Sequence, residues 1–241
     1  MRRLQKLLVI AMAVTALTVA TMPVGAAAET ASELRGGELT LVHGVPGEAG
    51  FPVDITVTGK YFGWQQTFAG VEFGAVAAVD VPFDKYKVEV RVAGSDPASP
   101  AVLKAGTWVG FRDKAVVAHL DGDGNPTISK FNNSTFLLRS DKAKVTVRHL
   151  AAAPAVDIIA NDALTLIDGL SNPDQGAVRV PAGTYNVKVA ADADNSVVVY
   201  DADLTFDGGT NTIVYAVGSL EGGSFMPLVQ VKHASYVWGN K

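Results

Sequence analysis

The feature that most constrains this chain is an internal repeat. The segment from Val145 to Ile158 reads VTVRHLAAAPAVDI, and an edited copy from Leu39 to Ile55 reads LTLVHGVPGEAGFPVDI. Each copy is an alternating apolar run that ends on a histidine, then a turn with small residues and proline, then Val-Asp opening a second run. Alternation with a period of two is typical of half-buried β-strands. The repeat therefore predicts two similar β units in tandem.

The repeat extends to the last residues, because Thr135-Phe-Leu-Leu matches Ser235-Tyr-Val-Trp at an offset of 100 positions. At 241 residues the chain has room for two domains of common size. We predict an all-β fold, with two tandem immunoglobulin-like β-sandwich domains after a signal peptide. The predicted segments are a signal peptide at 1–28, a flexible leader at 29–37, a first β-sandwich repeat at 38–139, a linker at 140–142 and a second repeat at 143–241.

The N-terminus has the pattern of a secretory signal. Two arginines and a lysine precede an apolar run at 7–20, and an Ala-x-Ala pattern ends at Ala28. The alternative is a retained anchor helix, but Pro23 and Gly25 interrupt the apolar segment. We therefore expect an extracellular or cell-surface protein whose only contact with a membrane is transient, through the signal peptide.

Charge and cysteine content exclude several classes of protein. Loss of the three basic residues of the signal segment takes the net charge from −4 to −7, which disfavours nucleic acid as a partner. The chain has no cysteine, so it has neither a disulfide framework nor a thiol for lipid attachment.

Three kinds of residue recur at matching places in the two copies and indicate a structural motif. A histidine ends the first strand in phase with its apolar side chains, an aspartate in the second strand points to solvent, and a tyrosine four positions after a proline opens a later strand with its ring inward. Pro-x-x-x-Tyr is typical of immunoglobulin-like sandwiches where the chain passes between sheets, and a buried tyrosine hydroxyl needs a hydrogen-bond partner. The motif residues are His43, Asp54, Tyr86, His149, Asp157 and Tyr185.

These residues also carry a family resemblance. His149 with Pro154-Ala-Val-Asp157, and then Val180-Pro-Ala-Gly-Thr-Tyr185, resemble the bacterial secreted domain of unknown function 4397. The likeness is closer in the second copy, and it identifies the chain as a tandem repeat of that domain. The resemblance implies a small β domain of exported or envelope proteins and brings no catalytic residue with it.

No metal or cofactor site is predicted. The four histidines lack metal-ligand spacing, and for His43 and His149 we expect bonds to loop backbone instead. Asp121, Asp123 and Asn125 alternate as in a calcium loop, but Pro126 stands where glycine is needed. A hairpin turn is the favoured interpretation, and a weak calcium site is the alternative.

Enzymatic chemistry has no support in the sequence. Neither Ser171 nor Ser219 lies in a G-x-S-x-G elbow, and no glycine-rich phosphate loop opens a helix. Asp201 and Asp203 share one face of a strand, where solvated charge is the usual explanation. We therefore predict a non-enzymatic protein.

The best candidate binding segment is the aromatic stretch from Tyr61 to Phe73. Exposed aromatics on a β surface stack on sugar rings or anchor protein partners, and Tyr61, Trp64 and Phe68 are the candidates. Core packing is the alternative. The sequence thus predicts a binding or adhesion module for an unknown protein or glycan, monomeric or weakly self-associating. A structural cell-envelope component is the alternative function, and a hydrolase using Asp-rich loops is a weaker one.

Overall fold

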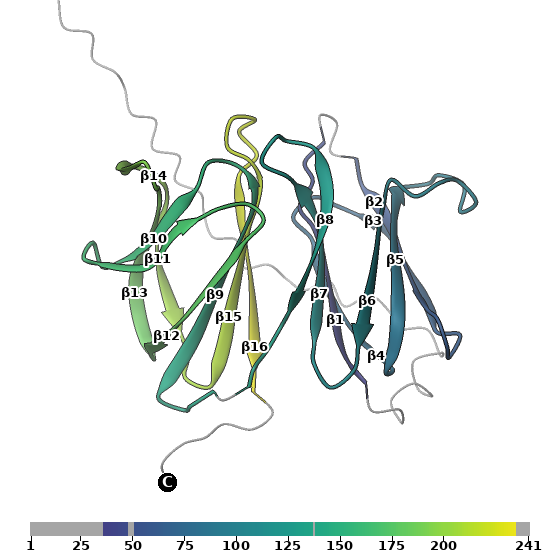
Figure 1. Ribbon diagram of the computed structural model, residues 1–241, viewed down its shortest axis with the longest axis horizontal. Coiled ribbons are helices and arrows are strands. Elements are labelled where there is room, and N and C mark those ends of the chain that lie inside the picture. Colours follow the sequence, from purple (N-terminus) through teal and green to yellow (C-terminus); the bar gives the residue numbers. More distant parts are fainter. Residues whose placement is uncertain (1–35, 48–50, 137, 235–241) are drawn as a thin grey trace, which may run out of the picture.

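The computed structural model describes residues 36–47, 51–136 and 138–234, which form strands and connecting turns (Figure 1). This part of the chain contains no helix, and hence none long and apolar enough to cross a membrane. The all-β prediction is confirmed. The predicted signal peptide, nearly all of the predicted leader and the segment 235–241 lie outside the described residues.

The strands fall into two sets of eight along the chain. The first set is β1 (Gly37–His43), β2 (Val53–Gly59), β3 (Gln65–Val71), β4 (Val76–Val81), β5 (Asp84–Val92), β6 (Leu103–Val109), β7 (Lys114–Leu120) and β8 (Pro126–Asn132). The second set is β9 (Lys142–Ala152), β10 (Val156–Ala160), β11 (Leu164–Leu170), β12 (Gln175–Pro181), β13 (Gly183–Ala191), β14 (Asp194–Phe206), β15 (Thr210–Ser219) and β16 (Met226–His233).

The strands form four sheets, and their order recurs. The first set gives the sheets β4-β1-β7-β8 and β3-β2-β5-β6, which we call the N-terminal pair. The second set gives β12-β9-β15-β16 and β11-β10-β13-β14, the C-terminal pair, so that every strand number is raised by eight. Figure 1 shows the four sheets stacked as layers, with β3-β2-β5-β6 at one end and β11-β10-β13-β14 at the other.

The strand order differs from the predicted immunoglobulin-like one. In an immunoglobulin sandwich the first strand lies beside the second, in a sheet with the fourth and fifth. Here β1 pairs antiparallel with β4 and parallel with β7, while β2 lies in the opposite sheet. Strand β9 begins at Lys142, the last residue of the predicted linker.

Apolar side chains fill three layers between the four sheets. One cluster lies between the sheets of the N-terminal pair and a second lies between those of the C-terminal pair. A third joins the pairs, because it combines Val42 and Val117 of the N-terminal pair with Leu150, Ile213 and Tyr215 of the C-terminal pair. The two middle sheets are therefore buried on both faces, which explains the long buried runs of β7, β9 and β15.

A polar network crosses the contact between the two pairs. Arg148 on β9 is fully buried, and its guanidinium donates to Gln175, to the Tyr215 hydroxyl, and to the Asn132 carbonyl and Asn133 side chain at the end of β8. The same group lies 4.5 Å from the centre of the Phe131 ring. Arg148 thus ties the C-terminal pair to the strand that ends the N-terminal pair.

Candidate functional site

The loop between β2 and β3 is held by one buried carboxylate. Asp84, which has no exposed surface, accepts the backbone N–H groups of Tyr61 at 3.0 Å, Phe62 at 3.2 Å and Lys85 at 2.6 Å. Gly63 completes the loop with a φ of 68°, a conformation that glycine adopts without strain. The loop therefore presents Tyr61 and Phe62 to solvent from a fixed backbone.

Four exposed aromatic rings form a continuous cluster at this end of the N-terminal pair. Tyr61 stacks on Trp108 of β6, with ring centroids 5.9 Å apart and planes at 26°. Phe83 lies 5.9 Å from Trp108 and 6.2 Å from Phe111. All four are substantially exposed, from 46% at Phe83 to 84% at Phe111. We call Tyr61, Phe83, Trp108 and Phe111 the aromatic cluster. A contiguous exposed apolar surface of this kind is typical of interaction sites.

The structure separates the three aromatic residues predicted from the sequence. Tyr61 belongs to the aromatic cluster and is 57% exposed. Trp64 packs on the N-terminal core, edge to face with Tyr86 at 5.6 Å, and Phe68 packs against the same core. Trp64 and Phe68 thus take part in core packing, which was the predicted alternative to a binding role.

Sequence reasoning missed Phe83, Trp108 and Phe111. A signal for Trp108 was present, because β6 alternates and places Trp108 on the face opposite to Leu103 and Ala105. Nothing in the sequence places the three rings together. Their contact depends on the pairing of β5 with β6.

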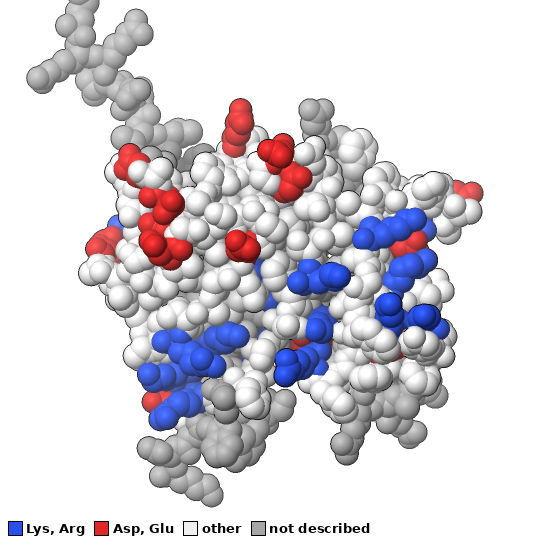
Figure 2. Space-filling model, viewed as in Figure 1, with Lys and Arg blue, Asp and Glu red and all other residues white. Residues whose placement is uncertain are grey.

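A lysine-lined groove adjoins the aromatic cluster on the outer face of the sheet β3-β2-β5-β6. It has a volume of about 500 Å³, and Gly106 of β6 lies in its lining. Its four basic side chains are Lys60, Lys85, Lys87 and Lys104. Figure 2 shows Lys and Arg side chains on the side of the molecule where Figure 1 places β5, β6 and β8, and a second group of them at the lower end of the C-terminal pair.

One carboxylate, Glu89, lies among the cations on this face. It pairs with Lys87 at 2.9 Å, Arg91 at 3.5 Å and Lys104 at 4.0 Å. The pKa of Glu89 is lowered, chiefly by the hydrogen bond from Lys87. Lys60 instead lies over the Tyr61 ring at 5.1 Å. The groove therefore carries a positive excess in an acidic protein.

The recurring tyrosines and one histidine make backbone contacts. Tyr86 donates its hydroxyl proton to the Pro82 carbonyl at 2.8 Å, and Tyr185 donates to Pro181 at 3.0 Å. His149 Nε2 lies 2.8 Å from the Pro154 carbonyl, across the turn that follows β9. Burial lowers the pKa of both His149 and His43, so each imidazole is neutral near pH 7.

The recurring aspartates anchor a bulge in each outer sheet. Asp54 accepts the N–H of Gly70, and Asp157 accepts that of Gly169, each glycine having a positive φ beside a shift in strand register. The prediction that Asp157 faces solvent is wrong, because its side chain turns back onto this bulge and the residue is 4% exposed. Asp54 is half-buried.

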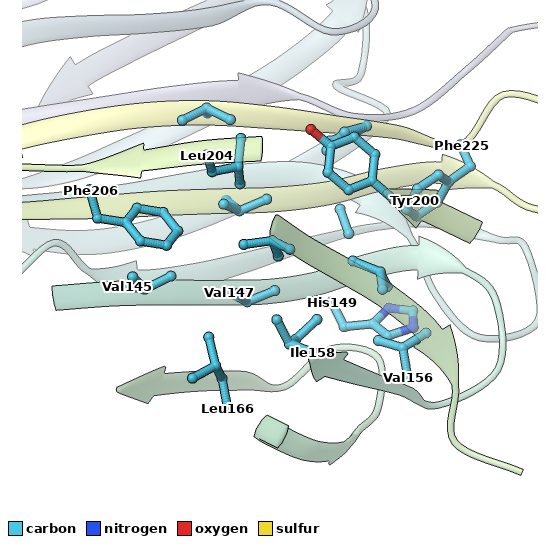
Figure 3. A pocket seen from close by; sticks show the side chains of 16 residues that line it. Val145, Val147, His149, Val156, Ile158, Leu166, Tyr200, Leu204, Phe206 and Phe225 are labelled. Atoms are coloured by element: carbon cyan, nitrogen blue, oxygen red, sulfur yellow. The ribbon is translucent and has the colours of Figure 1, made fainter. Parts of the chain in front are cut away.

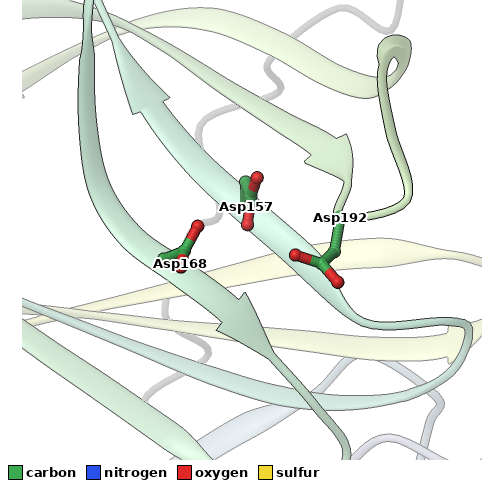
Figure 4. A group of neighbouring side chains, drawn as sticks. All are labelled: Asp157, Asp168 and Asp192. Atoms are coloured by element: carbon green, nitrogen blue, oxygen red, sulfur yellow. The ribbon is translucent and has the colours of Figure 1, made fainter.

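Asp157 lies beside two exposed carboxylates, Asp168 and Asp192, with oxygens within 4.8 Å of one another (Figure 4). Three carboxylates can supply oxygen ligands to a hard cation such as Ca²⁺. However, Asp157 already accepts a backbone amide, and the other two are exposed at the surface. The cluster is therefore explained by the bulge.

Asp121, Asp123 and Asn125 form a hairpin turn between β7 and β8. Asp121 Oδ1 accepts the backbone N–H groups of Asp123 at 3.0 Å and Asn125 at 2.8 Å. Both bonds lower the pKa of Asp121, and the bond from the Asn125 backbone has the larger effect. Asp201 and Asp203 are also engaged, since both accept the side-chain amide of Asn186. These carboxylates therefore serve turn and sheet structure.

A small apolar cavity lies between the two sheets of the C-terminal pair (Figure 3). Its volume is about 40 Å³, and its lining is almost entirely aliphatic and aromatic. His149 and Tyr200 are among the few lining residues with polar atoms. His149 bonds the Pro154 carbonyl, so the cavity is a small apolar space within this core.

The sequence matches the family model described as domain of unknown function (DUF4397) over residues 37–159, about half of the chain. The chain belongs to this family. The DUF4397 match is single and runs from β1 to β10, so it extends beyond the predicted first repeat. No curated protein matches the sequence.

Two solved structures illustrate the structural neighbours of this DUF4397 chain. The TIE protein of Bacillus anthracis is 12% identical, with 86% of this chain and 33% of that chain covered and a TM-score of 0.24. The fimbrial anchor protein Mfa2 of Porphyromonas gingivalis is 8% identical, with 83% and 98% covered and a TM-score of 0.23. The chain spans a third of the TIE protein, and scores this low assign no function to it.

Proposed function

We propose that this protein is an exported, non-enzymatic binding module, located outside the cell or at its surface. The aromatic cluster is the observation that carries the proposal. Burying aromatic rings contributes strongly to binding, and here the exposed rings include Trp108 on β6 and Tyr61 on the loop held by Asp84. The partner is a glycan or a protein that packs against these rings.

The two sheet pairs are tandem copies of one β-sandwich domain in this proposal. Support comes from the repeated strand order, from the Pro-to-Tyr hydrogen bond present in each pair, and from the Asp-to-Gly bulge present in each pair. Export rests on the basic and apolar pattern of residues 1–28. The protein acts without a cofactor, as a monomer or a weak self-associate.

Glycan and protein arrays probed with the purified protein test the proposal, with Trp108→Ala as the binding variant. Its matched control is Trp64→Ala, which removes an indole ring that precedes β3 and packs on the N-terminal core. We expect Trp108→Ala to reduce binding at least ~10-fold with little loss of stability, and Trp64→Ala to reduce stability instead. Absence of any ligand at micromolar concentration, or binding indifferent to Trp108, would contradict the proposal.

A second candidate function, a self-assembling structural component of the cell envelope, is favoured by one observation. The outer sheets lie at opposite ends of the molecule (Figure 1), and one carries the lysine-lined groove while the other carries the carboxylates Asp157, Asp168 and Asp192. End-to-end contact between unlike faces is a head-to-tail contact, which produces filaments where the rotation between copies does not close a ring. Sedimentation at increasing protein concentration separates this candidate from the first.

A further inference from the structure

We propose that the lysine-lined groove and the aromatic cluster together bind an acidic polysaccharide, a chain of sugar rings that carry carboxylate or sulfate groups. The inference rests on the proposed function and names the ligand class for the same face. It is drawn from the position of the cations relative to the rings, from the shape of the groove, and from the corresponding face of the C-terminal pair.

The cations and the rings are direct neighbours in the sheet. Lys85 of β5 lies opposite Trp108 of β6 in the antiparallel register, and Lys60 lies over the ring of Tyr61, which stacks on Trp108. Opposite residues in such a pair have Cβ atoms about 5 Å apart. A sugar ring seated on the stacked pair therefore has ammonium groups within reach of its acidic substituent.

The groove extends this arrangement along the sheet. Lys87 lies opposite Gly106, and Lys104 opposite Glu89. A Cβ at Gly106 would meet only the Tyr86 carbonyl, at 3.9 Å, so the missing side chain leaves space between Trp108 and Lys104. Lys130 of β8, in the facing sheet, places a further cation at the edge of β6, where its ammonium donates to the Gly106 carbonyl at 3.2 Å. The face suits an extended anionic chain better than a compact neutral ligand.

The corresponding face of the C-terminal pair has the opposite charge. Tyr86 and Tyr185, from the matching Pro-x-x-x-Tyr motifs, align the two pairs. In β13 and β14, Thr184 lies opposite Thr205 and Asn186 lies opposite Asp203. Asp203 therefore stands where Gly106 stands, and Thr205 where Trp108 stands. Lys188 stands where Glu89 stands, and Asp201 stands where Lys104 stands, so the acid and the base have exchanged strands. Among the described residues, the combination of cations, open groove and exposed rings is therefore found on the outer face of the N-terminal pair and not on that of the C-terminal pair.

The test uses one polysaccharide in two charge states. Binding of the full protein to polygalacturonate and to its fully methyl-esterified form is measured by isothermal titration calorimetry at two salt concentrations. We expect polygalacturonate to bind at least ~10-fold more tightly than the ester, with the difference reduced by salt. Dextran sulfate and polyglutamate complete the set, because the first changes the anion and the second removes the sugar ring. Loss of affinity for polyglutamate is expected, since it offers nothing to stack on Trp108.

Substitutions at Gly106 separate charge from shape. Gly106→Asp copies Asp203 and should abolish binding to polygalacturonate, whereas Gly106→Asn has nearly the same size and should retain a measurable part of it. Lys85→Gln with Lys87→Gln should weaken binding about 10-fold, and Arg179→Gln, on an exposed position of β12, should leave it unchanged. Circular dichroism of each variant checks that the fold is kept.

The outcomes distinguish this inference from the function on which it rests. Equal affinity for polygalacturonate and its ester, with both lost in Trp108→Ala, would overturn the acidic class and leave a neutral-glycan module. Binding of polyglutamate as tight as that of polygalacturonate would also overturn it, because charge alone would then suffice. Concentration-dependent association that Lys85→Gln with Lys87→Gln abolishes in the absence of polymer would assign this face to a second copy of the chain.

Discussion

Truncation of Arg148 tests whether the two sheet pairs depend on the buried network between them. Arg148 has no exposed surface, and all four of its hydrogen-bond partners are neutral groups, at 2.9 to 3.1 Å. Its pKa is lowered, chiefly by burial. The guanidinium is nevertheless held charged, because arginine does not lose its proton in proteins.

The expected cost of Arg148→Ala follows from these contacts. Hydrogen bonds to a charged donor contribute roughly 1.5–3 kcal/mol each, but removal of the buried charge also removes its desolvation cost. The acceptors Asn132 and Asn133 lose a donor, while the Tyr215 hydroxyl keeps its bond to Gln230. The unsatisfied acceptors, at about 1–3 kcal/mol each, and the cavity left by the side chain together cost about 3–5 kcal/mol after that offset.

Urea unfolding followed by circular dichroism measures this loss. With a slope of about 2–3 kcal/mol per molar urea, the midpoint should fall by roughly 1–2.5 M. Arg148→Lys should lose an intermediate amount, because one ammonium cannot reach four acceptors. Arg179→Ala, an exposed arginine on the neighbouring β12, should change the free energy of unfolding by less than about 0.5 kcal/mol. If Arg148→Ala behaves like Arg179→Ala, the network does not hold the two pairs together.

Three further perturbations test the packing and the titrating groups. Trp64→Ala should destabilise the protein by about 2–3 kcal/mol in thermal or urea unfolding, because the ring packs on Tyr86 and the N-terminal core; a near-neutral effect would show that the ring contributes little. Val147→Ile points a methylene toward the cavity in the C-terminal pair and should raise stability by about 0.5–1 kcal/mol, whereas Val42→Ile, at a fully buried position in the layer between the pairs, should lower it. Burial lowers the folded-state pKa of His43, His119 and His149 below 6.5. The unfolded chain therefore takes up protons that the folded chain does not, and the free energy of unfolding should fall as the pH drops from about 7 to 5. The slope is up to about 1.4 kcal/mol per pH unit for each histidine, and His119→Gln should reduce it; an unchanged slope in that variant would contradict the assignment.

Local patterns in the sequence were enough to locate several strands and the turn chemistry. The alternation from Val53 to Val57 corresponds to β2, with its apolar residues buried as predicted. Pro82 and Tyr86, four positions apart, form the hydrogen bond that a buried tyrosine requires. Such features depend on neighbouring residues, so periodicity and spacing are sufficient to predict them.

Long-range pairing was beyond those patterns. The parallel contact of β1 with β7 joins Leu39 to Lys114, and no local signal distinguishes it from the immunoglobulin-like order in which the first two strands are adjacent. The predicted exposure of Asp157 was wrong for a related reason. Alternation gives the face of the sheet on which a side chain lies, but the bulge at Gly169 decides that this carboxylate is buried.

The candidate site illustrates how function can separate from the repeat that defines the fold. Residues common to both pairs, such as Asp54 with Asp157 and Tyr86 with Tyr185, bond to backbone and fix the bulge or the turn. Lys85, Lys87 and Trp108, which have no counterpart of the same kind in the C-terminal pair, lie on an outer face, where no neighbouring sheet restricts them. Because an outward side chain in an end sheet can change its charge without disturbing a core, the two faces were free to become basic and acidic. The aromatic cluster and the groove occupy one of those faces, so a ligand of this protein should distinguish its two ends.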